Sequence, residues 1–177
     1  MKKALILSGH RYPERSRVNA AGLEALRALP NVTVHELTKA YPDFAIDVQR
    51  EQRLLVEHDV VVMLFPFWWY SSPSILKEWQ DQVLEYGFAY GSTGTALHGK
   101  PFMLMASTGG SPEAYSPEGY NRYPVEDLLL PFHAMANLTG MVWQEPALLM
   151  GANEISDEAL DRGVNGWLTR LHALLAV

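Results

Sequence analysis

The chain has 177 residues, of which 48% are hydrophobic and 19% charged, a composition typical of a globular protein. The net charge is −6 and the sequence contains no run of basic residues, which disfavours nucleic acid as a partner. Cysteine is absent, which excludes a disulfide framework and a thiolate nucleophile. No apolar run approaches the roughly 18 residues of a membrane span, so we expect one cytoplasmic domain over residues 1–177.

Short apolar or β-branched runs alternate with segments of helical period along the whole chain. The runs predict strands at residues 2–8, 32–37, 59–65, 101–107 and 142–150. Helices are predicted over residues 18–29, 47–58, 75–83, 125–140 and 160–175, with a kink or break at Pro131. Glu126 and Asp127 fit the acidic first turn of the fourth helix.

This alternation predicts an α/β fold, a doubly wound three-layer α/β/α sandwich. We expect a five-stranded parallel sheet of strand order 2-1-3-4-5. In such a fold, ligands bind at the carboxyl ends of the strands. The loops after the first, third and fourth strands are therefore the candidate site, and they are also the richest in polar, aromatic and glycine residues.

The first loop, "GHRYPERSRVN", ends at Ser16, a favoured helix N-cap. The free amides of Arg17, Val18 and Asn19 would face an anion such as a phosphate, and Arg11, Arg15 and Arg17 add positive charge. An ordinary N-cap with solvated arginines explains the same residues equally well. The loop has neither the G-x-G-x-x-G nor the G-K-[ST] pattern of other nucleotide-binding turns.

The second loop, "PFWWYSSP", places aromatic side chains at the tip of the third strand. Phe67, Trp68 and Trp69 suit stacking on a planar ring, although one or two of them would equally well plug the core. Ser72 is predicted as the N-cap of the next helix, with Pro73 at its first position.

The third loop begins "STGG", where Gly109 and Gly110 allow close approach of the backbone to a ligand. Such glycine pairs also occur in turns that bind nothing. The six histidines show no metal-ligand spacing, so no metal site is expected, and His35 and His172 are expected on the surface. No G-x-S-x-G pattern of a serine hydrolase is present.

Together the segments "GHRYPERSRVN", "YPDF", "FPFWWYSSPSILKEWQDQV", "GFAYG", "GTALHGK" and "STGG" resemble the flavodoxin-like NAD(P)H:quinone oxidoreductases. The likeness covers nearly the whole chain. It is strongest to the ancillary proteins of glutathione-regulated potassium-efflux systems.

The resemblance implies FMN as the cofactor, with FAD as the alternative, and NAD(P)H as the co-substrate. It places residues from all three loops around the flavin: His10, Ser16, Arg17, Val18, Asn19, Pro66, Phe67, Trp68, Trp69, Tyr70, Thr108, Gly109, Gly110 and Tyr115. Tyr115, Asn121 and Arg122 are the implied catalytic residues, and Asn121 stands where mammalian quinone reductases carry a histidine. Arg11 departs from the proline that usually follows the loop histidine.

The activity implied is ping-pong transfer of two electrons from NAD(P)H to a quinone by a homodimer. Two other readings stay open. In the first, the chain is a flavin-binding regulatory subunit of a potassium-efflux protein and lies at the inner face of the cell membrane. In the second, it is a flavodoxin-like domain that has lost its cofactor.

Overall fold

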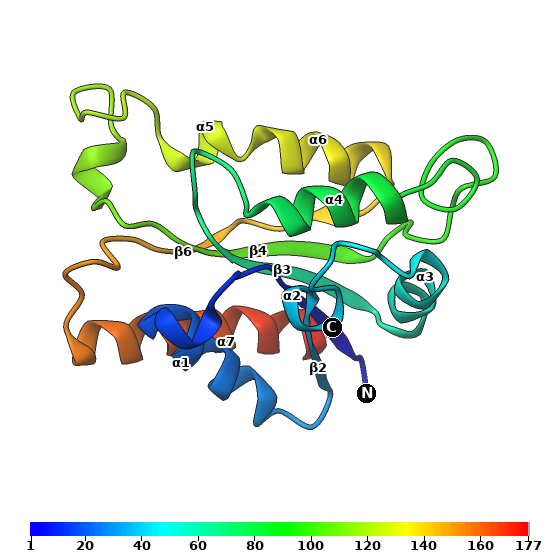
Figure 1. The fold of residues 1–177 in the computed structure, drawn as a ribbon, viewed down its shortest axis with the longest axis horizontal. Coiled ribbons are helices and arrows are strands. Elements are labelled where there is room, and N and C mark those ends of the chain that lie inside the picture. Colours follow the sequence, from blue (N-terminus) through cyan, green and yellow to red (C-terminus); the bar gives the residue numbers. More distant parts are fainter. Residues whose placement is uncertain (177) are drawn as a thin grey trace.

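The computed structural model describes residues 1–176 and contains a six-stranded parallel sheet between two layers of helices (Figure 1). The strands are β1 (Ala4–Ser8), β2 (Val32–Glu36), β3 (Val60–Pro66), β4 (Pro101–Ser107), β5 (Val142–Trp143) and β6 (Ala147–Leu149). The helices are α1 (Arg17–Arg27), α2 (Leu37–Ala40), α3 (Val48–Glu57), α4 (Ser74–Val83), α5 (Val125–Leu128), α6 (Leu130–Leu138) and α7 (Asp157–Ala176). Two short 3-10 helices, η1 (Pro13–Arg15) and η2 (Pro112–Tyr115), lie in loops.

The strand order is β2-β1-β3-β4-β5, which confirms the predicted doubly wound topology. The prediction of one strand over residues 142–150 was wrong, because β5 and β6 are separate and each pairs with β4. The two strands are interrupted at Pro146, which has no amide hydrogen to donate to a neighbouring strand.

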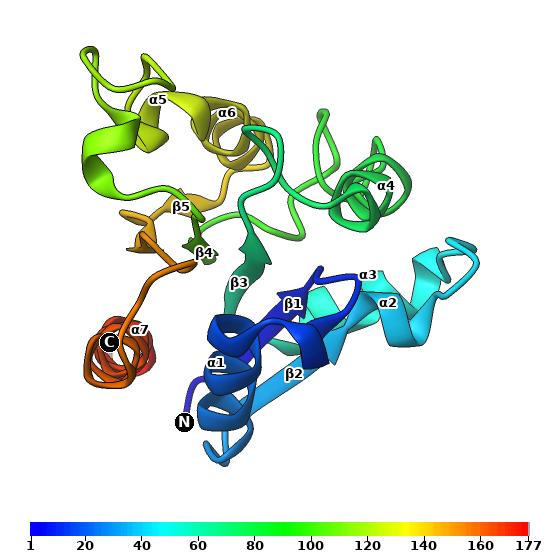
Figure 2. The ribbon, with the colours of Figure 1, turned by 60° about the vertical axis from the view of Figure 1, so that its left-hand side comes forward.

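The two faces of the sheet bury alternate residues of the same strands, as the period of two in a strand requires. On β1, Leu5 and Leu7 belong to the core beneath α4 and α6, whereas Ala4 and Ile6 belong to the core against α1 and α7. Figure 2 shows α6 and α7 on opposite sides of the sheet. Because both faces are covered, β1 and β3 are buried throughout.

The helix boundaries follow the local sequence with one exception. Ser16 is the N-cap of α1, as predicted, and the break at Pro131 is confirmed, since α5 ends at Leu128 and Pro131 lies in the first turn of α6. The assignment of Ser72 and Pro73 was wrong by one residue. Pro73 is itself the N-cap, with an extended ψ of 147°, and α4 begins at Ser74.

His35 was predicted on the surface, and this prediction was wrong. His35 on β2 is only 7% exposed, and its Nε2 lies 2.8 Å from Oε1 of the fully buried Glu51 on α3. A buried imidazole needs a polar partner, and a carboxylate on the covering helix supplies it. His172 on α7 is exposed, as expected.

Two further properties concern residues 1–176. None of their helices is both long and apolar enough to cross a membrane. No three of their His, Asp or Glu side chains are grouped closely enough to hold a metal ion.

Candidate functional site

A cavity of about 680 Å³ lies where the chain leaves the carboxyl ends of β1, β3, β4 and β6. The strand order reverses between β1 and β3, and such a switch point is where open α/β sheets bind ligands. The volume lies in the range of small-molecule sites. The residues that line the cavity are His10, Arg15, Ser16, Arg17, Val18, Pro66, Phe67, Trp68, Trp69, Ser107, Gly109, Ala152 and Asn153.

One end of the cavity is formed by the start of α1. The Ser16 hydroxyl oxygen accepts hydrogen bonds from the main-chain amide of Asn19 at 3.2 Å and from its side-chain amide at 3.0 Å. The Asn19 amide was expected to be free, but Ser16 occupies it, as it caps the helix. The amides of Arg17 and Val18 have no partner within the helix and carry its partial positive charge, so an anion is stabilised here. Asn19 is buried, and its Oδ1 makes no hydrogen bond with any residue of the described chain.

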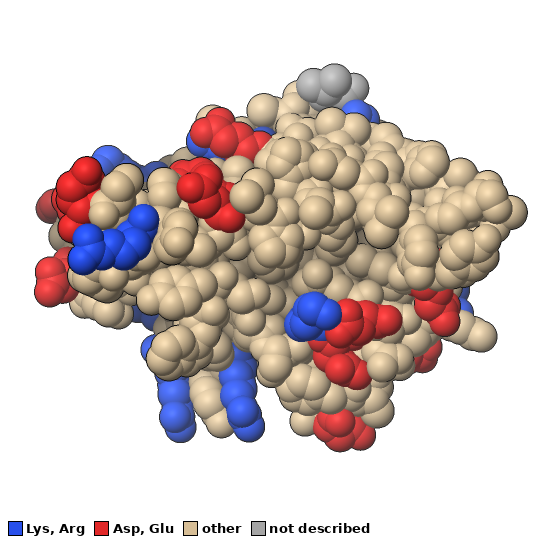
Figure 3. Space-filling model, turned by 90° about the horizontal axis from the view of Figure 1, so that it is seen from above, with Lys and Arg blue, Asp and Glu red and all other residues tan. Residues whose placement is uncertain are grey.

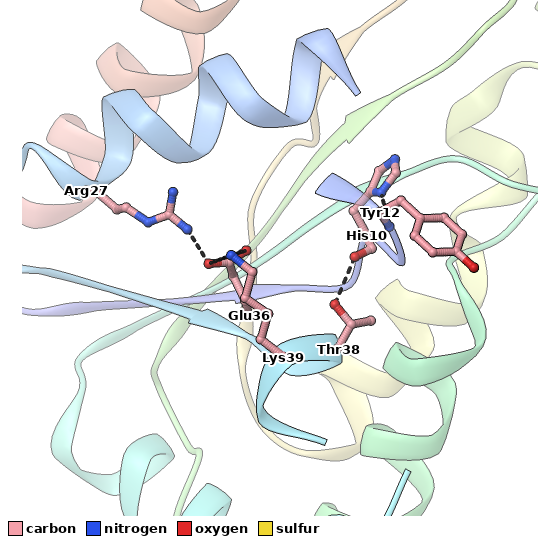
Figure 4. A network of polar contacts seen from close by, with 6 residues as sticks. All are labelled: His10, Tyr12, Arg27, Glu36, Thr38 and Lys39. Carbon is pink, nitrogen blue, oxygen red and sulfur yellow. Dashed lines mark hydrogen bonds and ion pairs between the residues drawn. The ribbon is translucent and has the colours of Figure 1, made fainter. Parts of the chain in front are cut away.

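His10 lies beside this end and is held by main-chain contacts. Its Nδ1 accepts a hydrogen bond of 2.9 Å from the amide of Tyr12, and its carbonyl accepts one of 3.0 Å from the Thr38 hydroxyl (Figure 4). The imidazole meets Trp68 edge-on, with ring centroids 5.1 Å apart. Burial lowers the pKa of His10 from its ordinary value, and nearby Glu14 partly offsets that effect.

The three arginines of the first loop differ in their surroundings. Arg17 donates a hydrogen bond of 2.7 Å to the carbonyl of Ile155 and forms an ion pair with Asp157. It therefore ties the start of α1 to the start of α7. Arg15 also lines the cavity, with its guanidinium 4.8 Å from the centre of the Tyr12 ring. Arg11 stacks more loosely on Tyr12, at 5.6 Å, and does not line the cavity.

The opposite end of the cavity is an aromatic turn after β3. The main chains of Trp68 and Ser71 exchange two hydrogen bonds of 3.1 Å, which closes a tight turn. The two central residues of the turn, Trp69 and Tyr70, have positive φ values of 48° and 62°. This backbone costs side-chain-bearing residues about 1–2 kcal/mol each, and it leaves Trp69 92% exposed at the rim.

The third loop is pinned to the loop after β6. The amides of Gly151 and Ala152 donate to the carbonyls of Gly110 and Thr108, both at 2.9 Å. Thr108 is fully buried, and its hydroxyl donates to the carbonyl of Gly110 at 2.7 Å. Gly109 faces the Asn153 side chain so closely that a Cβ atom there would lie 2.9 Å from the Asn153 Nδ2. Its lack of a side chain keeps Asn153 in the cavity wall.

None of the three predicted catalytic residues lines the cavity. The Tyr70 hydroxyl donates to Oδ1 of Asn121 at 3.0 Å, which links the aromatic turn to the loop after η2. The Tyr115 ring lies 6.0 Å from the Phe67 ring. Burial raises the pKa of Tyr115, with smaller contributions from Tyr120 and Tyr70, so its hydroxyl stays protonated and can donate. Arg122 is exposed, with a φ of 66°.

Most of the residues predicted to surround a ligand are thus brought together. The cavity wall holds His10, Ser16, Arg17, Val18, Pro66, Phe67, Trp68, Trp69 and Gly109. The wall does not include Asn19, Tyr70, Thr108, Gly110, Tyr115, Asn121 or Arg122.

Four lining residues are absent from the set that the resemblance placed around the flavin: Arg15, Ser107, Ala152 and Asn153. Arg15 was expected only as a source of positive charge near the first loop. Asn153 follows the last strand of the sheet. Asn153 could have been predicted as a site residue by the rule used for the other strands, because the loops after parallel strands meet at one edge of the sheet.

The residues present fit a flavin mononucleotide. One end of the cavity offers helix amides, a serine and Arg15 for a phosphate, and the other offers flat apolar side chains for a planar ring.

Comparison with known proteins agrees with this geometry. The sequence of residues 2–171 matches a protein family that is described as having a flavodoxin-like fold. The chain belongs to the flavodoxin-like fold family.

Relatives with this flavodoxin-like fold include three bacterial proteins. General stress protein 14 of Bacillus subtilis is 49% identical over 88% of this chain and 89% of its own length. The ancillary protein KefG of the glutathione-regulated potassium-efflux system of Pectobacterium carotovorum is 44% identical over 94% and 92% of the two chains. An uncharacterised NAD(P)H oxidoreductase of Bacillus subtilis, YdeQ, is 39% identical over 96% and 86%.

Two solved structures show the same arrangement of elements. The general stress protein 14 of Treponema denticola in complex with FMN superposes with a TM-score of 0.93, at 35% identity over 97% of this chain and 99% of that one. The NADPH-quinone reductase of P. pentosaceus superposes with a TM-score of 0.87, at 29% identity over 95% and 96%.

Proposed function

We propose that this protein is an FMN-dependent NAD(P)H:quinone oxidoreductase, acting as one domain of residues 1–177 in the cytoplasm. The observation that carries the proposal is the single cavity that joins the start of α1 to the aromatic turn after β3. Relatives named NAD(P)H oxidoreductase and NADPH-quinone reductase support the reaction class, and the relative in complex with FMN supports the cofactor.

In this proposal the phosphate of FMN is held by Ser16 and the amides of Arg17 and Val18, with Arg15 adding positive charge. Trp68, Trp69 and Phe67 would border the planar ring, with Gly109 and Asn153 in the same cavity wall. The bound flavin would supply two-electron transfer from NAD(P)H to a quinone in a ping-pong cycle.

The protein's own part in catalysis is to orient the reactants and to donate hydrogen bonds. The hydroxyl of Tyr115, kept protonated by the burial that raises its pKa, is proposed to donate to the oxygen of the acceptor as negative charge develops on it. The Tyr70–Asn121 hydrogen bond holds the aromatic turn against the loop that carries Tyr115, and Arg122 is proposed to attract anionic acceptors to this loop.

A spectrum and an anaerobic titration test this proposal. The purified protein is expected to be yellow, or to become so with FMN, to bleach with NADH or NADPH under argon, and to recover its absorbance with menadione. A protein that takes up neither FMN nor FAD contradicts the cofactor. Flavin that binds but is not reduced by either nicotinamide contradicts the reaction.

A second candidate, favoured by the likeness to the KefG ancillary protein, is regulation of a membrane potassium-efflux protein, with the chain peripheral at the inner face of the membrane. Co-purification with such a transporter, combined with negligible quinone turnover, supports this role. Rapid turnover in the absence of any transporter supports the enzyme.

The proposed assembly is a homodimer. The outer face of α6 carries exposed Leu130 and Leu138, the neighbouring β5 adds exposed Val142, and Figure 3 shows a broad area without charged side chains on this side of the molecule. Apolar patches of this kind mark interaction surfaces. Light scattering after gel filtration is expected to give twice the monomer mass, and Leu138→Lys is expected to reduce it to the monomer.

A further inference from the structure

Tyr120 lies in the loop after η2 and is 76% exposed, yet its hydroxyl lies against the third loop of the site. A Cβ atom at Gly110 would lie 2.9 Å from the Tyr120 hydroxyl oxygen and 3.2 Å from Cε2 of Tyr115. The two phenol side chains therefore come together at Gly110, which leaves them room because it has no side chain. Gly110 directly follows Gly109, a residue of the cavity wall.

The backbone on both sides of Tyr120 is held by hydrogen bonds. The amide of Gly119 donates to the carbonyl and to the hydroxyl of Ser116, both at 3.0 Å. The amide of Asn121 donates to the carbonyl of Ala114 at 3.0 Å. These contacts do not involve the Tyr120 side chain, so a change at its hydroxyl should leave the path of the loop unaltered.

The Tyr120 hydroxyl is close enough to Tyr115 to influence its ionisation. Burial raises the pKa of Tyr115, and Tyr120 and Tyr70 raise it further, since a phenolate forms less readily beside other phenols that can become negative. A phenol hydroxyl donates one hydrogen bond. Two such donors therefore lie side by side next to the aromatic end of the cavity, where the Tyr115 ring faces the Phe67 ring.

We propose that Tyr120 is a second hydrogen-bond donor to the electron acceptor, and that it acts with Tyr115 on the acceptor oxygen as negative charge develops there. This inference rests on the proposed function, in which Tyr115 alone donates. Tyr120 contributes only while the acceptor is being reduced. It is therefore not needed for the binding of FMN or for the reduction of the bound flavin by NAD(P)H.

Tyr120→Phe removes the hydroxyl and keeps the ring, and Tyr123→Phe, exposed in the same loop, is the matched control. Tyr120→Phe is expected to lower kcat/KM for menadione about 10-fold, the rate equivalent of one hydrogen bond to a developing charge. The rate with ferricyanide, which takes up single electrons and has no carbonyl oxygen, is expected to stay within about twofold because no such hydrogen bond is lost. The Kd of FMN and the anaerobic rate of flavin reduction by NADPH are expected to be unchanged.

The outcomes separate this inference from the proposed function. An unchanged kcat/KM for menadione in Tyr120→Phe would overturn the inference alone, as would an equal loss with ferricyanide or an equal loss in Tyr123→Phe. A wild-type protein that reduces no quinone would overturn the proposed function, and the inference with it.

The contact between the two phenols is tested without any ligand. In the NMR spectrum of protein labelled with ¹³Cζ-tyrosine, Tyr115→Phe identifies the signal of Tyr115. Tyr120→Phe is expected to lower the pKa of Tyr115 and Tyr123→Phe to leave it unchanged, because Tyr120 but not Tyr123 is among the groups that raise it. A pKa of Tyr115 that does not respond to Tyr120→Phe would show that the two hydroxyls lie too far apart to serve one acceptor.

Discussion

The indole nitrogen of Trp79 on α4 donates a hydrogen bond of 2.9 Å to Oε2 of Glu51 on α3. The other oxygen, Oε1, accepts from the Tyr41 hydroxyl at 2.5 Å and lies 2.8 Å from Nε2 of His35. One fully buried carboxylate thus joins β2, the segment after α2, and α4. Removing such a partner leaves several buried donors unsatisfied.

The substitution Glu51→Gln is expected to lower the free energy of unfolding by about 2–4 kcal/mol, because the new amide nitrogen would face donors. Urea denaturation followed by circular dichroism measures the change. Glu57→Gln, exposed on the same helix, is the control and is expected to stay within about 0.5 kcal/mol of the wild type. Equal effects of the two substitutions would show that the buried contacts contribute little.

The same carboxylate predicts a dependence of stability on pH. Desolvation raises the pKa of Glu51, but the hydrogen bonds from His35, Tyr41 and Trp79 outweigh it and lower the pKa below 4.5. A carboxyl group with a depressed pKa in the folded state contributes stability above its unfolded pKa and loses it as the pH falls through the folded value. The stability difference between wild type and Glu51→Gln should be constant above about pH 5 and shrink below pH 4.5. A difference that grows on acidification would contradict the assignment.

Gly22 on α1 and Gly166 on α7 are predicted to respond to alanine in opposite directions. A Cβ at Gly22 would lie 2.7 Å from Cζ3 of the buried Trp167, whereas nothing lies within 4 Å of a Cβ at Gly166. Gly22→Ala is therefore expected to destabilise the protein by about 1–3 kcal/mol through overpacking. Gly166→Ala is expected to stabilise it by about 0.5–1 kcal/mol through helix propensity. Thermal unfolding of both variants decides this, and a stabilised Gly22→Ala would mean that α1 and α7 pack more loosely.

Arg15 is predicted to attract the phosphate from an exposed position. Arg15→Gln should weaken FMN binding by about two- to fivefold, since exposed charge pairs are worth about 0.2–1 kcal/mol, and leave riboflavin binding unchanged. The difference should disappear at about 1 M salt, where exposed charges are screened. Fluorescence titrations measure both ligands, with exposed Arg162→Gln as the control. An effect that persists at high salt would place Arg15 in direct, buried contact with the ligand.

Trp69 is predicted to improve binding at the expense of stability. Its φ of 48° suits glycine, so Trp69→Gly is expected to stabilise the fold by about 1 kcal/mol. Loss of the exposed indole at the cavity rim is expected to weaken FMN binding and to raise the fluorescence of bound flavin. The two effects are measured by urea denaturation and by titration. Unchanged binding would show that Trp69 does not cover the ring.

The architecture was predictable because burial on both faces leaves a simple mark in the sequence, the unbroken apolar runs of β1, β3 and β4. The division of the last strand was signalled by Pro146 but was not recognised, since residues 142–150 are otherwise apolar enough for one strand. Ser16 was found because an N-cap depends only on local sequence.

Contacts between distant residues were harder to predict. The partners His35 and Glu51 are 16 positions apart, and neither local sequence indicates that the other will be buried beside it. The same holds for Asn153, whose place in the cavity wall depends on β6 lying next to β4. The separation of Tyr115, Asn121 and Arg122 from the cavity wall likewise follows from the path of a loop rather than from its composition.

The interruption of the last strand at Pro146 also affects how the molecules behave toward one another. A long, regular outer strand offers its free amides and carbonyls to other chains and invites growth of the sheet into aggregates. Here that edge consists of the two-residue strand β5 and the three-residue strand β6, separated by residues 144–146, so it is a poor template for such growth. The same irregularity that obscured the strand in the sequence thus makes this edge of the sheet unsuited to fibril-like growth.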